Sequence, residues 1–188
     1  MATDEQRRGW LPRAHAVPSP NFDARSRNAV IDLLVIHAIS LPPGEFGGAY
    51  IEQLFTNRLA ADAHPYFAAL DGLRVSAHFL ILRNGRLIQF VDVFARAWHA
   101  GDSNWQGRTR CNDFSVGVEL EGCDEQPFAD AQYATLGPLL EDLFDLLPAL
   151  SVERLVGHSD IAPARKTDPG PLFDWNRLRQ TLSRRTSC

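Results

Sequence analysis

Residue types that suit metal binding and amide chemistry stand together near the end of the chain. The segment Val156–Pro171 reads VGHSDIAPARKTDPGP and places His158, Lys166 and Asp168 within eleven residues. Its three prolines stiffen the loop, and a rigid loop holds side chains at the set angles that a metal or catalytic site requires. Lys166 is also the only lysine among 19 basic residues. Taken singly, Asp168 could cap a turn and Lys166 could be a solvated charge; together they favour a site.

A further candidate ligand, His37, stands directly after an apolar segment. Ala29–Ile36 reads AVIDLLVI and is typical of a buried strand, and α/β proteins commonly build their sites where such strands end. By itself, His37 would more often be a hydrogen-bonded core residue. With His158 and Asp168 it completes a set of two imidazoles and one carboxylate, which leaves one position of a tetrahedral zinc ion for water. Zinc brings the pKa of that water down to about 7 and so supplies a nucleophile at neutral pH.

The strands that must position these residues are predicted by short apolar runs. Asn84-Gly85 is typical of a tight turn and predicts a hairpin between Val75–Leu82 and Arg86–Val91. Two further buried strands are expected at Ser115–Leu120 and at Leu155–Gly157, the second of which leads into His158.

Three segments have helical spacing. The first is Tyr50–Leu59. The second follows Asp130, a candidate N-cap, and Pro138 should kink or split it. Its apolar side is formed by Tyr133, Leu136, Leu140, Leu143 and Leu147. Asp174 is a candidate cap for a last helix that carries Trp175, Leu178 and Leu182. Strands alternating with helices, plus one hairpin, predict a single α/β domain over residues 1–188, with a mixed central sheet flanked by helices.

The composition of the chain restricts its expected binding partners and its expected cellular compartment. The chain has 188 residues, 45% of them hydrophobic, and a net charge of −4, which gives no general attraction to nucleic acid or to an anionic membrane. No stretch approaches the roughly 20 apolar residues of a membrane span. The start, MATDEQRR, lacks the pattern of a secretory signal, and the three cysteines form no CxxC pair. We therefore expect a cytoplasmic protein whose termini, Met1–Arg8 and Arg184–Cys188, are frayed.

Five motifs together resemble the zinc-dependent N-acetylmuramoyl-L-alanine amidase family, which also includes phage lysozyme-type amidases and peptidoglycan recognition proteins. They run from Val35 to Trp175, and PSPNFD at Pro18–Asp23 extends the likeness, so the motif-bearing part covers about residues 18–175. The motifs are VIHAISLPPGEFGG (Val35–Gly48), LRVSAHFLI (Leu73–Ile81), RAWHAG (Arg96–Gly101), RCNDFSVGVELEG (Arg110–Gly122) and GHSDIAPARKTDPGPLFDW (Gly157–Trp175).

The resemblance implies a role for each matching position. One zinc ion per chain would be held by His37, His158 and Asp168. Glu119 would be the catalytic acid and base, and Lys166 the catalytic lysine. For substrate binding, the resemblance implies Arg74 and Arg110 on the peptide and Trp98 against the sugar or peptide face. The physical alternatives are solvated charges for the two arginines and a core position for Trp98.

The residues alone do not separate Glu119 from Glu121. The two lie two apart on the expected strand and so share one face. A carboxylate beside the metal could carry a proton to the departing amine, and either residue could supply it; only the family pattern favours Glu119. The pattern is not matched everywhere, since Ala38 follows the first ligand where the family commonly has Asn.

The remaining histidines and cysteines have less specific interpretations. We expect His78 to be a hydrogen-bonded strand residue and His99 to line the pocket. His15 and His64 are expected on the surface or in loops. Cys111 and Cys123 are expected as small buried fillers, since their spacing matches no zinc knuckle.

The activity implied is hydrolysis of the amide bond between N-acetyl-1,6-anhydromuramic acid and L-alanine in peptidoglycan fragments, by a monomer that recycles cell wall in the cytoplasm. The resemblance also implies a regulatory consequence, since an enzyme that clears anhydromuropeptides can restrain β-lactamase induction. One alternative is a broader amidase acting on non-anhydro muropeptides. The other is a non-catalytic peptidoglycan-binding module; relatives of that kind lose a zinc ligand, whereas this sequence has both histidines and the aspartate.

Overall fold

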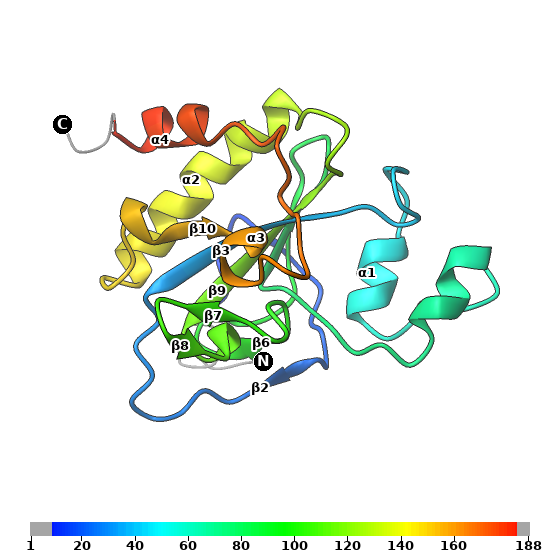
Figure 1. Ribbon diagram of the computed structural model, residues 1–188, viewed down its shortest axis with the longest axis horizontal. Coiled ribbons are helices and arrows are strands. Elements are labelled where there is room, and N and C mark those ends of the chain that lie inside the picture. Colours follow the sequence, from blue (N-terminus) through cyan, green and yellow to red (C-terminus); the bar gives the residue numbers. More distant parts are fainter. Residues whose placement is uncertain (1–8, 184–188) are drawn as a thin grey trace.

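The computed structural model describes residues 9–183, and Met1–Arg8 and Arg184–Cys188, for which fraying was expected, lie outside the described residues. A mixed six-stranded sheet forms the centre (Figure 1). All its neighbouring strands are parallel except β4 and β5, which are antiparallel. In sheet order the strands are β1 (His15–Ala16), β5 (Leu87–Gln89), β4 (Phe79–Ile81), β9 (Ser115–Glu121), β3 (Leu33–Ile39) and β10 (Leu155–Gly157).

Two short two-stranded sheets and several helices complete the fold. β2 (Phe22–Asp23) pairs with β6 (Arg96–Ala97), and β7 (Asn104–Trp105) pairs with β8 (Arg108–Thr109). The helices are α1 (Tyr50–Phe55), α2 (Asp130–Leu146), α3 (His158–Ile161) and α4 (Trp175–Ser183), with 3-10 turns η2 (Pro65–Leu70), η3 (Cys111–Asp113) and η4 (Val152–Arg154). This confirms the expected α/β class with a mixed sheet. No helix among residues 9–183 is long and apolar enough to cross a membrane.

The central strands bury both of their faces, because different elements cover each side. Leu34 and Ile36 of β3 belong to a core that also contains the apolar side of α2 and two leucines of α4. Leu33 and Val35, which point the other way, pack in a second core with Cys111 and Phe114. Since alternate residues of a strand share a face, His37 lies on the side of Leu33 and Val35, opposite α2 and α4.

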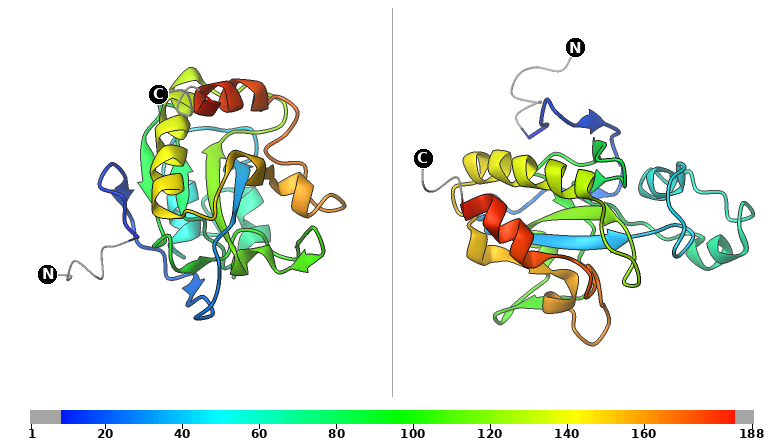
Figure 2. Two further views of the ribbon diagram at one scale, coloured as in Figure 1. Left: turned by 90° about the vertical axis from the view of Figure 1, so that its left-hand side faces the viewer. Right: turned by 90° about the horizontal axis from the view of Figure 1, so that it is seen from above.

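A third core lies at one end of the sheet, where α1 and η2 stand apart from α2 and α4 in Figure 1 and in the right-hand view of Figure 2. Phe55 of α1 and Phe67 of η2 pack there against Leu80 of β4 and Ile88 of β5. This lobe supplies one wall of the cavity described below.

Several expected elements differ in their bounds. The first strand is shifted, so that β3 runs through His37 to Ile39 and does not stop before the histidine. The hairpin at Asn84-Gly85 is confirmed, but its strands are short. Asp174 does cap α4, because its Oδ1 accepts a hydrogen bond of 2.8 Å from the Arg177 backbone N–H. Asp130, by contrast, is the first residue of α2 and not its cap.

The prediction that Pro138 would split α2 is wrong, since α2 is continuous from Asp130 to Leu146. Proline removes one backbone hydrogen bond, to the carbonyl four residues earlier. That carbonyl belongs to Ala134, which is exposed, so water can satisfy it. The buried leucines on the opposite side of α2 hold the helix against the sheet, and such packing supplies most of a helix's stability.

Candidate metal centre and active site

His37, His158 and Asp168 converge on one point. The Nδ1 atoms of His37 and His158 are 3.0 Å apart, and Asp168 Oδ2 lies 3.2 Å from the first and 3.1 Å from the second. Both imidazoles are buried, and the carboxylate is only partly exposed. Among the described residues, these three form the group whose chemistry and spacing suit a metal ion. The structure thus brings together the three residues that the sequence analysis expected to be metal ligands.

Each of these three residues lies on a different segment of the chain. His37 lies on β3, and His158 begins α3 directly after β10, the strand that pairs in parallel with β3. Asp168 lies on the proline-rich loop after α3, where its backbone carbonyl accepts a hydrogen bond of 2.9 Å from the Ser159 N–H. Gly157 makes this approach possible, because a Cβ there would lie 2.8 Å from the ring of Pro169.

The outer nitrogen of His158 shows which of its atoms can bind a metal. Its Nε2 lies 3.1 Å from the carbonyl oxygen of Ala100, which can only accept a hydrogen bond. The proton of the neutral ring therefore sits on Nε2, and the Nδ1 lone pair faces His37 and Asp168. Arg165 donates to the same carbonyl at 2.7 Å and holds it in place.

Burial keeps the His37 imidazole neutral. Its side chain is enclosed, and removal from water disfavours the imidazolium ion, so the pKa falls from 6.5 to about 4. At neutral pH the ring is therefore uncharged, as a metal ligand must be.

Glu119 is the carboxylate nearest to this cluster on the sheet. It is the residue of β9 paired in register with His37 of β3, and it lines the same cavity as His158 and Asp168. Its Oε2 atom is buried and has no hydrogen-bond partner within the described part of the chain. Burial, reinforced by the charge of Asp168, raises the pKa of Glu119 well above its usual value.

The cavity beside the cluster has a volume of about 240 Å³ and two unlike walls. One wall carries Glu119, His158, Lys166 and Asp168. The other is largely apolar and comes from the α1 and η2 lobe and the segment after it, with Leu54, Phe55, Tyr66, Leu70 and Leu73. Tyr66 and Leu73 are each 42% exposed, so part of this wall is open to solvent. A ligand with an apolar or ring-shaped part and an amide group would find complementary surfaces here.

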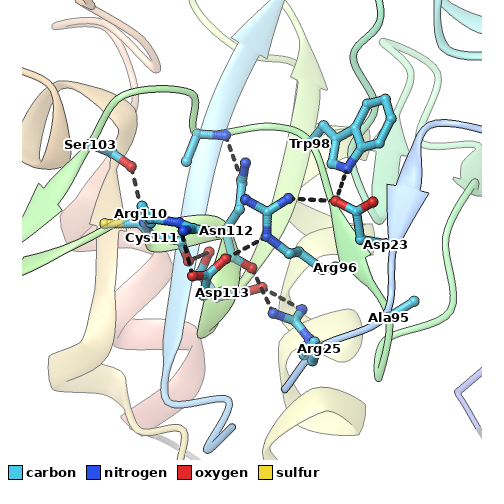
Figure 3. A network of polar contacts seen from close by, with 12 residues as sticks. Asp23, Arg25, Ala95, Arg96, Trp98, Ser103, Arg110, Cys111, Asn112 and Asp113 are labelled. Atoms are coloured by element: carbon cyan, nitrogen blue, oxygen red, sulfur yellow. Dashed lines mark hydrogen bonds and ion pairs between the residues drawn. The ribbon is translucent and has the colours of Figure 1, made fainter.

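The three residues expected to bind substrate are not gathered in one place. Trp98 lines the cavity, and its Nε1 donates a hydrogen bond of 2.7 Å to Asp23, as Figure 3 shows. Arg110 lies outside the cavity lining, on an exposed turn where it forms an ion pair of 3.2 Å with Asp113. Arg74 is also exposed and outside the lining, between the lining residues Leu73 and Val75.

Other residues are placed much as their types suggested. His78 is fully buried and hydrogen-bonded, accepting from the Gly117 N–H at 3.0 Å. His99 lines the cavity, as expected, but it also contacts His37, which the sequence did not indicate. Ala38 lines the cavity with a methyl group. Cys111 is a buried core residue, whereas Cys123 is only half-buried, so the prediction of a buried filler is wrong for Cys123.

A buried His, His, Asp cluster, with a buried glutamate and a lysine around one cavity, is the arrangement of a hydrolase that uses a metal ion. A sequence profile described as N-acetylmuramoyl-L-alanine amidase matches residues 26–171. The chain belongs to the N-acetylmuramoyl-L-alanine amidase family.

Individual relatives agree with this assignment. The chain is 53% identical to the 1,6-anhydro-N-acetylmuramyl-L-alanine amidase AmpD of Escherichia coli over 179 residues, covering 95% of this chain and 97% of that protein. It is similar to a crystal structure of an AmpD selenomethionine derivative, with a TM-score of 0.90, 53% identity and coverage of 97% and 99%. A complex of the E. coli amidase AmiD with the substrate anhydro-N-acetylmuramic acid-L-Ala-D-γ-Glu-L-Lys is more distant, with a TM-score of 0.59, 35% identity and coverage of 84% and 60%.

Proposed function

We propose that this protein hydrolyses the amide bond between N-acetyl-1,6-anhydromuramic acid and L-alanine in peptidoglycan fragments, with one zinc ion held by His37, His158 and Asp168. The observation that carries the proposal is the convergence of three candidate ligand atoms beside a cavity that His158, Asp168, Glu119 and Lys166 line. The high identity to AmpD over nearly the whole chain supports the choice of substrate.

The donor set fits zinc. Two imidazole nitrogens and one carboxylate oxygen are a usual three-ligand set for a catalytic zinc ion. Zinc bonds of about 2.0–2.2 Å at tetrahedral angles would hold ligand atoms roughly 3.3–3.6 Å apart. The three separations here are slightly shorter, at 3.0, 3.2 and 3.1 Å. When bound, zinc supplies Lewis acidity, which lowers the pKa of water towards about 7 and polarises an amide carbonyl.

Glu119 and Lys166 would provide the proton transfer and the charge stabilisation. Glu119, with a raised pKa and a free buried oxygen, is suited to take a proton from the attacking water and to give it to the leaving amine of L-alanine. Lys166 brings a positive charge to the same wall, where it would stabilise the negative charge that develops on the carbonyl oxygen.

Substrate binding would use both walls of the cavity. We propose that Trp98 and the apolar wall pack against the anhydro sugar. We also propose that Arg74 and Arg110 reach the carboxylates of the stem peptide from the cavity rim, since a guanidinium group binds a carboxylate at two points. The pair of Arg110 with Asp113 is exposed, and exposed ion pairs are weak enough to exchange for such a partner.

We further propose that the protein acts as a monomer in the cytoplasm. Cys111 and Cys123 are free, and free thiols suit a reducing compartment.

The test is release of peptide from a purified N-acetyl-anhydromuramyl-tripeptide, followed by mass spectrometry. We expect free tripeptide with an L-alanine N-terminus, loss of that product after chelation, and recovery with added zinc. Lys166→Met should lower turnover by about 10²–10³ while the zinc content stays unchanged. Equal turnover on the non-anhydro muramyl-tripeptide would favour the broader amidase. Binding without turnover would favour the non-catalytic module, and full activity after complete zinc removal would contradict the mechanism.

A further inference from the structure

The side of His37 that faces away from His158 and Asp168 contacts a chain of buried polar groups. Its Nε2 lies 2.9 Å from Nδ1 of His99, and the two rings meet at 84° with their centroids 5.0 Å apart. Nε2 of His99 lies 3.2 Å from Oγ of Ser115. The Ser115 hydroxyl in turn donates to the backbone carbonyl of Cys111 at 2.6 Å. Neither His99 nor Ser115 has a role in the proposed chemistry above.

The hydrogen bonds of this chain can run in only one direction. The carbonyl of Cys111 can only accept, so it takes the single hydroxyl hydrogen of Ser115. Ser115 must then accept from His99, which places the proton of that neutral ring on Nε2. Nδ1 of His99 is left as an acceptor and takes a hydrogen from Nε2 of His37.

As a result, the ring proton of His37 is on Nε2, and its Nδ1 atom carries no proton. This is the atom that lies within 3.2 Å of His158 Nδ1 and Asp168 Oδ2. The outer chain of hydrogen bonds therefore selects the nitrogen that faces the other two ligands.

His99 is fixed in position independently of His37. The backbone N–H groups of His99 and Ala100 both donate to Oδ1 of the buried Asn112, at 3.1 and 2.8 Å. The ring lies directly on Gly117, where a Cβ would be only 2.4 Å from its Cγ atom. The position and tilt of the ring are thus set by the backbone of β9 and by Asn112, before any contact with His37.

We propose that His99 is a positioning residue that, with Ser115, fixes the tautomer and orientation of His37 so that Nδ1 is presented to the metal. This rests on the zinc site of the proposed function. The two ligand histidines are then held by different means, because a backbone carbonyl orients His158 while side chains orient His37. Partners of this kind contribute about 10- to 100-fold to metal affinity.

The first test measures zinc affinity by competition with a chromogenic chelator. His99→Leu keeps the side-chain volume but removes the acceptor, and it should weaken zinc binding by about 10- to 100-fold. His99→Asn places an amide oxygen near the position of Nδ1 and should restore the affinity to within about threefold of the original. Ser115→Ala removes only the outer link and should give an intermediate loss.

The matched control is His78→Leu. His78 is also buried and its ring lies 5.7 Å from that of His99, but it makes no hydrogen bond to His37. It should lower the melting temperature of the metal-free protein about as much as His99→Leu while leaving zinc affinity nearly unchanged. Equal zinc affinity in His99→Leu and the original protein would overturn the proposal, as would equal losses in His99→Leu and His78→Leu.

The second test observes the tautomers directly by long-range ¹H–¹⁵N NMR of the histidine rings in the full-length protein. We expect the proton on Nε2 in both His99 and His37, with and without zinc. A proton on Nδ1 of His99 would overturn the proposal. If the protein binds no zinc at all, the proposed function fails, but this spectrum of the metal-free protein still decides whether His99 orients His37.

Discussion

Glu119 and Glu121 project from the same face of β9, but their carboxylates have different surroundings. Both oxygens of Glu121 are occupied, one by the Gly47 N–H at 2.5 Å and the other by the Arg83 N–H at 2.9 Å. Glu121 therefore ties two loops to the sheet. Glu119 keeps an oxygen without a partner at the cavity wall, and an unpaired buried carboxylate is costly unless it has a function. At the scale of single residues, this difference separates a structural carboxylate from a catalytic candidate.

Replacement by glutamine should have different consequences for Glu119 and Glu121. Glu119→Gln should lower kcat for anhydromuramyl-peptide by about 10²–10⁴, because the amide cannot transfer a proton; its zinc content should not change. Glu121→Gln is the matched control, and it should lower the melting temperature while retaining most of the turnover. Steady-state kinetics and thermal unfolding of both variants provide the check. Near-normal kcat in Glu119→Gln would remove Glu119 from the mechanism.

At the scale of elements, the site depends on a glycine in β9. Gly117 leaves room for the ring of His99, and Gly122, directly after the strand, leaves room for Phe128 in the same way. Gly117→Ala should push His99 away from His37 and weaken zinc binding by roughly tenfold. Gly122→Ala introduces a similar clash with Phe128, which belongs to the core beside α2 and not to the histidine cluster, and should reduce only the stability. Zinc titration and thermal unfolding distinguish the two; unchanged zinc affinity in Gly117→Ala would show that the ring position is not needed.

The sequence predicted the secondary-structure elements better than the contacts between elements that are distant along the chain. His37, His158 and Asp168 could be found because the first follows an apolar run, the other two stand in a proline-rich segment, and the family resemblance assigned all three. The hairpin at Asn84-Gly85 followed from local turn chemistry. The register that pairs His37 with Glu119 depends on contacts between distant segments, which periodicity does not encode.

The same dependence on long-range contacts explains why the sequence analysis missed the His99–Ser115 link and mispredicted α2. The link from His99 to Ser115 joins a loop to the first residue of β9 through side-chain geometry, and neither residue type is unusual where it stands. Gly117, in the middle of an apolar strand, was the available signal, because a glycine inside a strand often marks a close approach by another group. The uninterrupted α2 was mispredicted because the rule for Pro138 is local, whereas packing on the sheet decides the outcome.

At the scale of the whole molecule, buried neutral histidines make stability depend on pH. Burial, helped by the positive charge of Arg25, lowers the pKa of His78 from 6.5 to about 3. Below pH 6.5 the unfolded chain therefore binds a proton that the folded protein does not, and the free energy of unfolding decreases as the pH falls towards 3.

His78→Gln should make that decrease shallower, by up to about 1.4 kcal/mol per pH unit. The measurement is urea unfolding of the metal-free protein from pH 7 to pH 4, with chelator present throughout. His15→Gln, at an exposed position of β1, is the control and should leave the slope unchanged. Parallel curves for His78→Gln and the original protein would contradict a buried, neutral His78.

The central claim is that His37, His158 and Asp168 hold one zinc ion, and anomalous diffraction at the zinc edge tests it most directly. Crystals of the protein purified without added chelator should give a single strong peak, about 2.0–2.2 Å from Nδ1 of both histidines and from a carboxylate oxygen of Asp168. A peak elsewhere, or no peak after soaking with zinc, would contradict the account.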